Sequence, residues 1–167
     1  MERISLNIDI QEQQKLAQEH IKEQGLRVLV CAGTGCVANG AMKVIEKFKE
    51  LGADVAVLSD YDKMTIVPTG CHGFCEQGVL VVIPDKHVTY VKVKEKDVEE
   101  IYKSHIKNGQ PVERLLYVDP KTHEHVMDDE HINFYAKQTR TALANCGNIN
   151  AESIEEAIAV RGYEALS

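Results

Sequence analysis

Apolar and polar positions alternate with clear periods at the start of the chain. Residues 1–25 are mostly polar, and their few apolar positions recur at roughly helical spacing. Residues 26–30 are a short apolar run of the kind that fits a buried strand. Apolar side chains then recur at steps of three and four up to a glycine stop at Gly52: Val37, Ala41, Val44, Ile45 and Phe48. The pattern predicts an N-terminal helix, a strand and an amphipathic helix.

The next segments predict further strands. Residues 54–58 are expected to form a second strand, which a helical crossover places parallel to the first. A short β segment at 64–68 follows, and the runs 78–84 and 88–93, joined by the tight turn 85–87, predict an antiparallel hairpin.

A second amphipathic helix completes this part of the chain. One face is apolar and the helix closes at Asn108-Gly109, with these side chains expected inside: Val98, Ile101, Tyr102, His105 and Ile106. The order β-α-β-β-β-α over residues 26–110 fits a small α/β sandwich of the thioredoxin type.

The pattern changes beyond Pro111. Residues 112–133 are polar and irregular, which predicts a linker or wrapping arm with no core element. Two further helices are expected, over residues 134–144 and from an N-cap at Asn150 to Gly162. Neither buries much surface alone, so we expect residues 111–167 to dock on the first domain or on a partner.

Four of the five cysteines lie in two glycine-rich turns, each after an apolar run. The spacing is Cys31-x4-Cys36 and Cys71-x3-Cys75, with 34 residues between the two pairs. Four thiolates from two loops are the complement that a [2Fe–2S] cluster takes, with two on each iron. The surrounding glycines let backbone N–H groups approach sulfur, and the first turn leads into a helix N-terminus that favours an anionic thiolate: Gly33, Gly35, Gly70 and Gly73.

Other uses of these thiols stay open at this point. Structural zinc also takes four cysteines, although its pairs are usually spaced Cys-x2-Cys. A dithiol oxidoreductase of the thioredoxin kind needs Cys-x-x-Cys at a helix start, which neither pair has. Simple buried or free thiols do not account for two glycine-flanked pairs.

The remaining candidate ligands have alternative interpretations. His72 is expected to tune the cluster by hydrogen bonding or to face solvent, and Cys146 to be a packing residue on a turn between helices. The histidines on the acidic segment are expected to be solvated loop residues: His123, His125 and His131.

The charge balance excludes two classes of partner. With 19 basic and 26 acidic residues the net charge is −7, so nucleic acid and anionic membrane surfaces would be repelled. No apolar run approaches the roughly 20 residues that span a bilayer, and we expect a cytoplasmic protein without membrane insertion.

Two stretches carry a family resemblance. Val28-Leu-Val-Cys31-Ala-Gly-Thr-Gly-Cys36 and Thr69-Gly-Cys71-His-Gly-Phe-Cys75-Glu76 resemble the N-terminal thioredoxin-like [2Fe–2S] ferredoxin domain of the NADH-binding flavoprotein (beta) subunit of NAD(P)-dependent and electron-bifurcating iron-only hydrogenases. That subunit is related to the complex I flavoprotein subunit. Four stretches further on are similar to its connection toward the flavin domain: 111–116, 134–140, 145–147 and 161–166.

The resemblance implies an electron-transfer module in which Cys31, Cys36, Cys71 and Cys75 hold one [2Fe–2S] cluster. The net charge of −7 and a site on exposed loops predict a low reduction potential for this cluster. The resemblance also implies partners among the other subunits or domains of a hydrogenase or NADH dehydrogenase-like complex, with homo-oligomerisation left open. The glycine-rich flavin and nicotinamide segments do not occur in this sequence, so FMN and NAD(P) are expected only on a downstream domain and the chain alone is not expected to be catalytic. The alternative is a structural zinc or subunit-docking module without a redox role.

Overall fold

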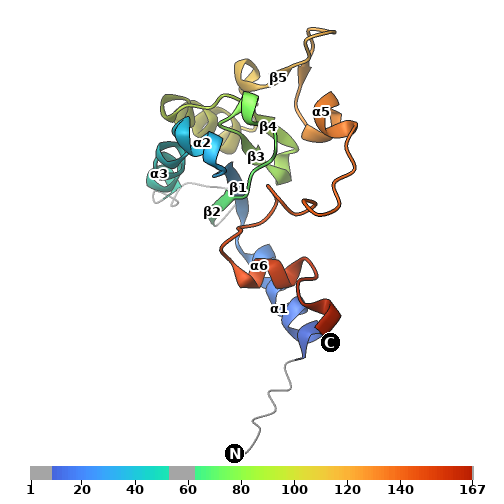
Figure 1. The fold of residues 1–167 in the computed structure, drawn as a ribbon. Helices are drawn as coiled ribbons and strands as arrows, with labels where there is room; N and C mark the ends of the chain where they lie inside the picture. The colour runs from blue at the N-terminus through green and yellow to red at the C-terminus, as the bar shows by residue number, and fades with distance from the viewer. Residues whose placement is uncertain (1–8, 53–62, 167) are drawn as a thin grey trace, which may run out of the picture.

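The centre of the protein is a four-stranded sheet with strand order β2-β1-β3-β4 (Figure 1). The computed structural model describes residues 9–52 and 63–166. The strands are β1 (Leu26–Cys31), β2 (Met64–Thr69), β3 (Val81–Ile83) and β4 (Val88–Tyr90). β1 and β2 run parallel, with Cys31 opposite Thr69, so both strands end at the same edge of the sheet. This register brings Cys71, two residues beyond β2, to the edge at which Cys31 lies.

The strand predictions hold for most of the described residues. β3 and β4 pair antiparallel across the turn η3 (Pro84–Lys86), which confirms the hairpin, although both strands are shorter than expected. The short segment expected at 64–68 is a full partner of β1 that runs parallel to it. The strand expected at 54–58 lies outside the described residues.

The helix after the first cysteine turn is divided in two. α2 (Thr34–Ala38) and α3 (Ala41–Gly52) are separated at Gly40, whose φ of +94° lies in the region that favours glycine. The face predicted for α3 is fully buried, but Val37 is 41% exposed because the break turns α2 away from that face. The prediction was therefore right for α3 and wrong for Val37.

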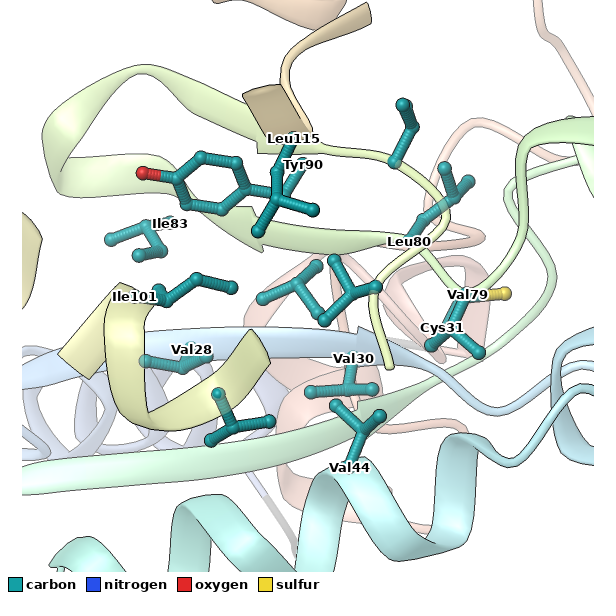
Figure 2. Close-up of a cluster of buried hydrophobic side chains, with 14 of the residues drawn as sticks. Val28, Val30, Cys31, Val44, Val79, Leu80, Ile83, Tyr90, Ile101 and Leu115 are labelled. Carbon is teal, nitrogen blue, oxygen red and sulfur yellow. The ribbon is translucent and has the colours of Figure 1, made fainter. Parts of the chain in front are cut away.

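The second amphipathic helix has its predicted inner face. α4 (Val98–Glu100) continues into a π-helical segment, η5 (Ile101–Lys107), and all five residues of the expected face are buried. Figure 2 shows Ile101 among the side chains that β1 and α3 contribute to this core. In the same core, the Tyr90 hydroxyl lies 2.8 Å from His105 Nδ1 and accepts a bond of 3.0 Å from the Val112 N–H.

The segment after Pro111 enters the core, contrary to the expectation that it holds no core element. Five of its apolar side chains belong to the main buried cluster: Val112, Leu115, Leu116, Tyr117 and Ile132. The backbone explains this, since the Val91 N–H donates to the Leu115 carbonyl at 2.8 Å and Leu116 bridges to Tyr90 beside β4. The turn that joins β5 (Tyr117–Val118) and β6 (His125–Val126) projects outward (Figure 1), while Tyr117 and Ile132 on either side of it stay buried.

The terminal helices pair with each other. α1 (Ile10–Glu23) packs against α6 (Ile154–Ala159), and together they lie apart from the sheet (Figure 1). Arg27 and Glu156 form an ion pair of 2.6 Å at the base of this pair. Of the stripe predicted on α1, Ala17 is buried while Leu16 is 52% exposed.

The helices expected after residue 133 are shorter than predicted. α5 (Asn133–Ala136) replaces the helix at 134–144, and α6 is capped by Ser153 rather than Asn150. The remaining short 3-10 segments are η2 (Cys75–Gln77), η4 (Glu95–Asp97), η6 (Glu113–Leu115), η7 (Asp129–His131) and η8 (Glu164–Leu166). Among residues 9–52 and 63–166, no helix combines the length and apolarity needed to cross a bilayer.

Candidate metal centre

The first cysteine pair is built on regular secondary structure. Cys31 is the last residue of β1, and Cys36 lies within α2, whose N-cap is Gly33 in an extended conformation. Both cysteine side chains belong to the apolar core and are 1% exposed. The position of this pair is therefore fixed by a buried strand and by the helix that follows it.

The second pair lies on the irregular connection between β2 and β3. Cys71 and Cys75 are both exposed, and their sulfurs are 3.7 Å apart. Gly73 lies between them with a φ of +85°, and its backbone N–H donates to Cys71 Sγ at 3.3 Å. A side chain at residue 73 would strain this turn, so glycine is needed for the N–H to face the sulfur.

The two pairs meet across glycines. A Cβ atom on Gly33 would lie 2.8 Å from the Cβ of Cys71, and one on Gly35 would lie 3.6 Å from Cys75 Sγ. On the other side, a Cβ on Gly78 would lie 2.7 Å from Cys36 Sγ. Only hydrogen fits at Gly33 and Gly78, so glycine permits the approach of the two turns. Gly33 and Gly35 were predicted from the sequence, but Gly78, three residues after Cys75, was not.

The buried thiols have strongly shifted pKa values. The hydrogen bond from Cys36 lowers the pKa of Cys31 to about 6, with further bonds from the backbone N–H groups of His72 and Gly33 acting in the same direction against burial. The pKa of Cys36 is raised by its bond with Cys31 and by burial. This part of the core therefore stabilises a thiolate on Cys31 at neutral pH.

The pKa of Cys71, in the exposed pair, is set by a different balance of effects. The Gly73 N–H lowers the pKa of Cys71, but burial and the neighbouring thiol of Cys75 outweigh it, so that the net pKa is raised. The backbone groups that favour negative charge on sulfur come from both turns, because His72 belongs to the second turn and donates to a cysteine of the first.

His72 is a buried residue. It is 3% exposed, its Nε2 lies 3.4 Å from Thr69 Oγ1, and a Cβ on Gly147 would come within 2.6 Å of its ring. The alternative that its side chain faces solvent is therefore wrong. Burial, helped by the charge of Arg140, lowers its pKa to about 4, so the imidazole is neutral at physiological pH. Of the two roles expected for His72, hydrogen bonding to a thiol is the one the structure has, and it is the backbone N–H of His72 that donates to Cys31.

The C-terminal segment lies against the second cysteine turn. Phe134 stacks on Phe74 with ring centroids 4.4 Å apart, and Tyr135 meets the same ring edge-on at 5.6 Å. The Tyr135 hydroxyl is buried and has no hydrogen-bond partner among the described residues. Arg140 bonds to the carbonyl of His72. Of the two alternatives expected for this segment, docking on the first domain is thus confirmed for residues 134–147, whereas α6 packs on α1.

The other candidate ligands lie away from the four cysteines or beside the second cysteine turn. The three histidines of the acidic segment are all exposed, as expected for solvated positions: His123, His125 and His131. Cys146 is half-buried beside the second turn, where a Cβ on Gly70 would lie 3.9 Å from its sulfur.

The donor set fits a cluster with two irons. Among residues 9–52 and 63–166, no three Cys, His, Asp or Glu side chains surround a point that would hold one metal ion. The thiols are instead arranged as two pairs at one edge of the sheet, one buried and one exposed. Two thiolates for each iron, with backbone N–H groups directed at sulfur, is the arrangement that a [2Fe–2S] cluster requires.

Comparison with known proteins agrees with this geometry. Residues 17–105 match the family described as thioredoxin-like [2Fe–2S] ferredoxin. The chain belongs to this family. Its ferredoxin domain is 40% identical over 80 residues to a 2Fe-2S ferredoxin of Clostridium pasteurianum, a match that covers 48% of this chain and 76% of the relative.

Two proteins of Aquifex aeolicus extend the comparison. The ferredoxin domain is 38% identical over 82 residues to a 2Fe-2S ferredoxin of that organism, covering 48% of this chain and 71% of the relative. A solved thioredoxin-like [2Fe–2S] ferredoxin from A. aeolicus superimposes with a TM-score of 0.51 at 32% identity, covering 60% of this chain and 97% of the other. The thioredoxin-like ferredoxin fold predicted from the sequence is confirmed, and the cofactor of this domain is a [2Fe–2S] cluster.

Proposed function

We propose that Cys31, Cys36, Cys71 and Cys75 bind the [2Fe–2S] cluster and that the chain relays single electrons within a multi-subunit NAD(P)H-linked hydrogenase or a related oxidoreductase. The observation that carries the proposal is that both cysteine pairs converge at one sheet edge, with one pair buried and the other exposed. When bound, the cluster supplies a site that takes up and gives back one electron. The exposed pair leaves that site within reach of a partner.

The residues of the chain have separate tasks in this relay. The buried pair holds its half of the site in the core, where water does not compete for the thiolates. Backbone N–H groups of Gly33, His72 and Gly73 donate to sulfur and offset part of its negative charge. Electron transfer of this kind needs neither an acid–base pair nor a substrate pocket.

The residues beyond the family match support the proposal that the chain belongs to a larger complex. Residues 106–167 lie outside that match, and the runs 134–140 and 145–147 are similar to the connection that precedes the flavin domain in hydrogenase subunits. FMN and NAD(P) would then belong to another domain or subunit, and the chain would act in the cytoplasm. Phe134 stacks on Phe74 and Arg140 donates to the His72 carbonyl, so the run 134–140 contacts the second cysteine turn.

The test is reduction through the partner subunits. The tagged chain is purified anaerobically from its own cells, and the cluster absorption is followed on adding NADH, NADPH or H2. We expect bleaching when a flavin-containing partner is present, and no bleaching by NAD(P)H in the chain stripped of partners with salt. A cluster-loaded chain that purifies without any flavin- or hydrogen-dependent partner, and that none of the three reductants bleaches, would contradict the proposed complex.

A further inference from the structure

The segment from residue 133 to residue 148 lies outside the family match but contacts the second cysteine turn directly. Its central residue is Arg140, which is half-buried. The Arg140 side chain is held from three sides. Nη1 donates to the Cys146 carbonyl at 3.3 Å, Nη2 donates to the His72 carbonyl, and the guanidinium lies 5.3 Å from the centre of the Tyr135 ring.

The carbonyl that Arg140 binds belongs to a particular peptide group. The His72 carbonyl and the Gly73 N–H are the two ends of one peptide unit, and that N–H donates to Cys71 Sγ at 3.3 Å. A continuous chain of hydrogen bonds therefore runs from the guanidinium through the peptide to the sulfur. A cation at the carbonyl end polarises the peptide and strengthens the bond that its N–H makes.

The geometry leaves little room for another arrangement. A Cβ on Gly73 would lie only 3.2 Å from Arg140 Nη2, so the guanidinium fits closely over the glycine. The aromatic contacts of Phe134 and Tyr135 with Phe74 place the start of the segment on the same turn. The arginine is thus positioned by this protein's own C-terminal segment.

We propose that Arg140 is a positioning residue that raises the reduction potential of the cluster, acting through the His72–Gly73 peptide on Cys71. The proposal rests on the ligand set proposed above. Reduction adds one negative charge to the cluster, and a polarised N–H at sulfur stabilises the reduced form more than the oxidised form. The C-terminal segment thereby tunes a centre whose ligands all lie N-terminal to it.

The test is a redox titration of the isolated full chain, monitored by EPR, in the wild type and in Arg140→Gln. At a fixed ambient potential the variant should shift the ratio of oxidised to reduced protein toward oxidised by about tenfold, which corresponds to about 59 mV for a one-electron couple. Arg140→Lys keeps the charge but not the planar fork, so its shift should have the same direction and be smaller. Lys137→Gln, the same charge change at an exposed position of the same segment, should leave the potential unchanged.

Several results would overturn the proposal. One is a fully iron-loaded Arg140→Gln protein with the wild-type potential, and another is an equal shift in Lys137→Gln. Should Arg140→Gln fail to retain iron, the lysine variant decides, and a wild-type potential in it counts against the proposal. The titration needs no partner, so its outcome is independent of whether the chain belongs to a hydrogenase complex. A wild-type chain that binds no iron would instead contradict the proposed cysteine ligands.

Discussion

The two cysteine pairs differ in what holds them. Cys31 and Cys36 lie on β1 and α2, within the apolar core, and both are 1% exposed. Cys71 and Cys75 are exposed on an irregular turn that contacts Arg140, far along the chain. The position of the first pair is therefore set by local secondary structure, and that of the second by long-range contacts. The comparison predicts that the two halves of the site respond differently to the same change.

The largest difference is expected for loss of a thiol. Cys36→Ser places a hydroxyl in the core, where water cannot replace the lost ligand, and should remove nearly all bound iron. Cys75→Ser changes an exposed position, where the serine oxygen or water can substitute, and should retain a measurable part. Iron and sulfide content after anaerobic reconstitution distinguishes the two. Equal loss in both variants would contradict the proposed asymmetry.

The next effect concerns the glycines between the pairs. Gly33→Ala forces its Cβ to within 2.8 Å of the Cys71 Cβ, so the two turns must separate and cluster content should fall markedly. Gly35→Ala is the matched control, because its Cβ meets Cys75 only at the ordinary distance of 3.6 Å. The visible absorbance per chain measures both. A fully loaded Gly33→Ala protein would show that the turns do not need this close approach.

A smaller effect is expected where the C-terminal segment contacts the second turn. Phe134→Ala removes the ring stacked on Phe74. The loss of stacking should destabilise the segment by about 1 kcal/mol in addition to the loss of buried apolar surface, so that iron is lost faster to a chelator. Leu143→Ala, an exposed position of the same segment, is the control. The rate of bleaching by a chelator gives the comparison. Equal rates in the two variants would mean that the stacking does not protect the second pair.

The smallest effect concerns the apolar core in which the first pair lies. Burial, with the charge of Lys86, lowers the pKa of His105, whose Nδ1 lies beside the Tyr90 hydroxyl. The unfolded chain therefore binds this proton at a higher pH than the folded protein does. The contribution of His105 to stability should be complete above about pH 6.5 and be lost as the pH falls below it.

The measurement for His105 is the urea midpoint by circular dichroism between pH 7.5 and pH 5.5. Wild type should lose more stability over this interval than His105→Gln, which cannot take up the proton. Adding His105→Gln to Cys36→Ser and to Cys75→Ser should leave the ratio of iron retained by these two cysteine variants unchanged. A wild-type protein whose midpoint changes with pH no more than that of His105→Gln would count against a buried neutral imidazole.

The first half of the site could be predicted from the sequence because its determinants are local. The apolar run before Cys31 and the three- and four-residue steps of Ala41, Val44 and Phe48 define a strand and a helix, and the structure has both. The same applies to the buried face of Val98 to Ile106. The glycines between the two cysteines of the first turn were a sufficient signal for Gly33.

The second half of the site could not be predicted in the same way. Nothing near Arg140 in the sequence indicates that it binds the carbonyl of His72, because the contact joins residues 68 positions apart. Residues 112–117 were predicted to be a linker although Val112, Leu115 and Leu116 stand at steps of three and four, because so short an apolar stretch does not define a core element by its period. They are buried because irregular backbone there bonds to the edge at Tyr90 and Val91.

Metal analysis combined with EPR shows whether the two unlike cysteine pairs hold one cluster. The chain is purified anaerobically, its iron, sulfide and zinc are quantified, and a spectrum is recorded after reduction with dithionite. The account predicts about two irons per chain, a red-brown colour and an S = 1/2 signal from the reduced protein. One zinc per chain, no colour and no signal would contradict it and would support a structural metal site instead.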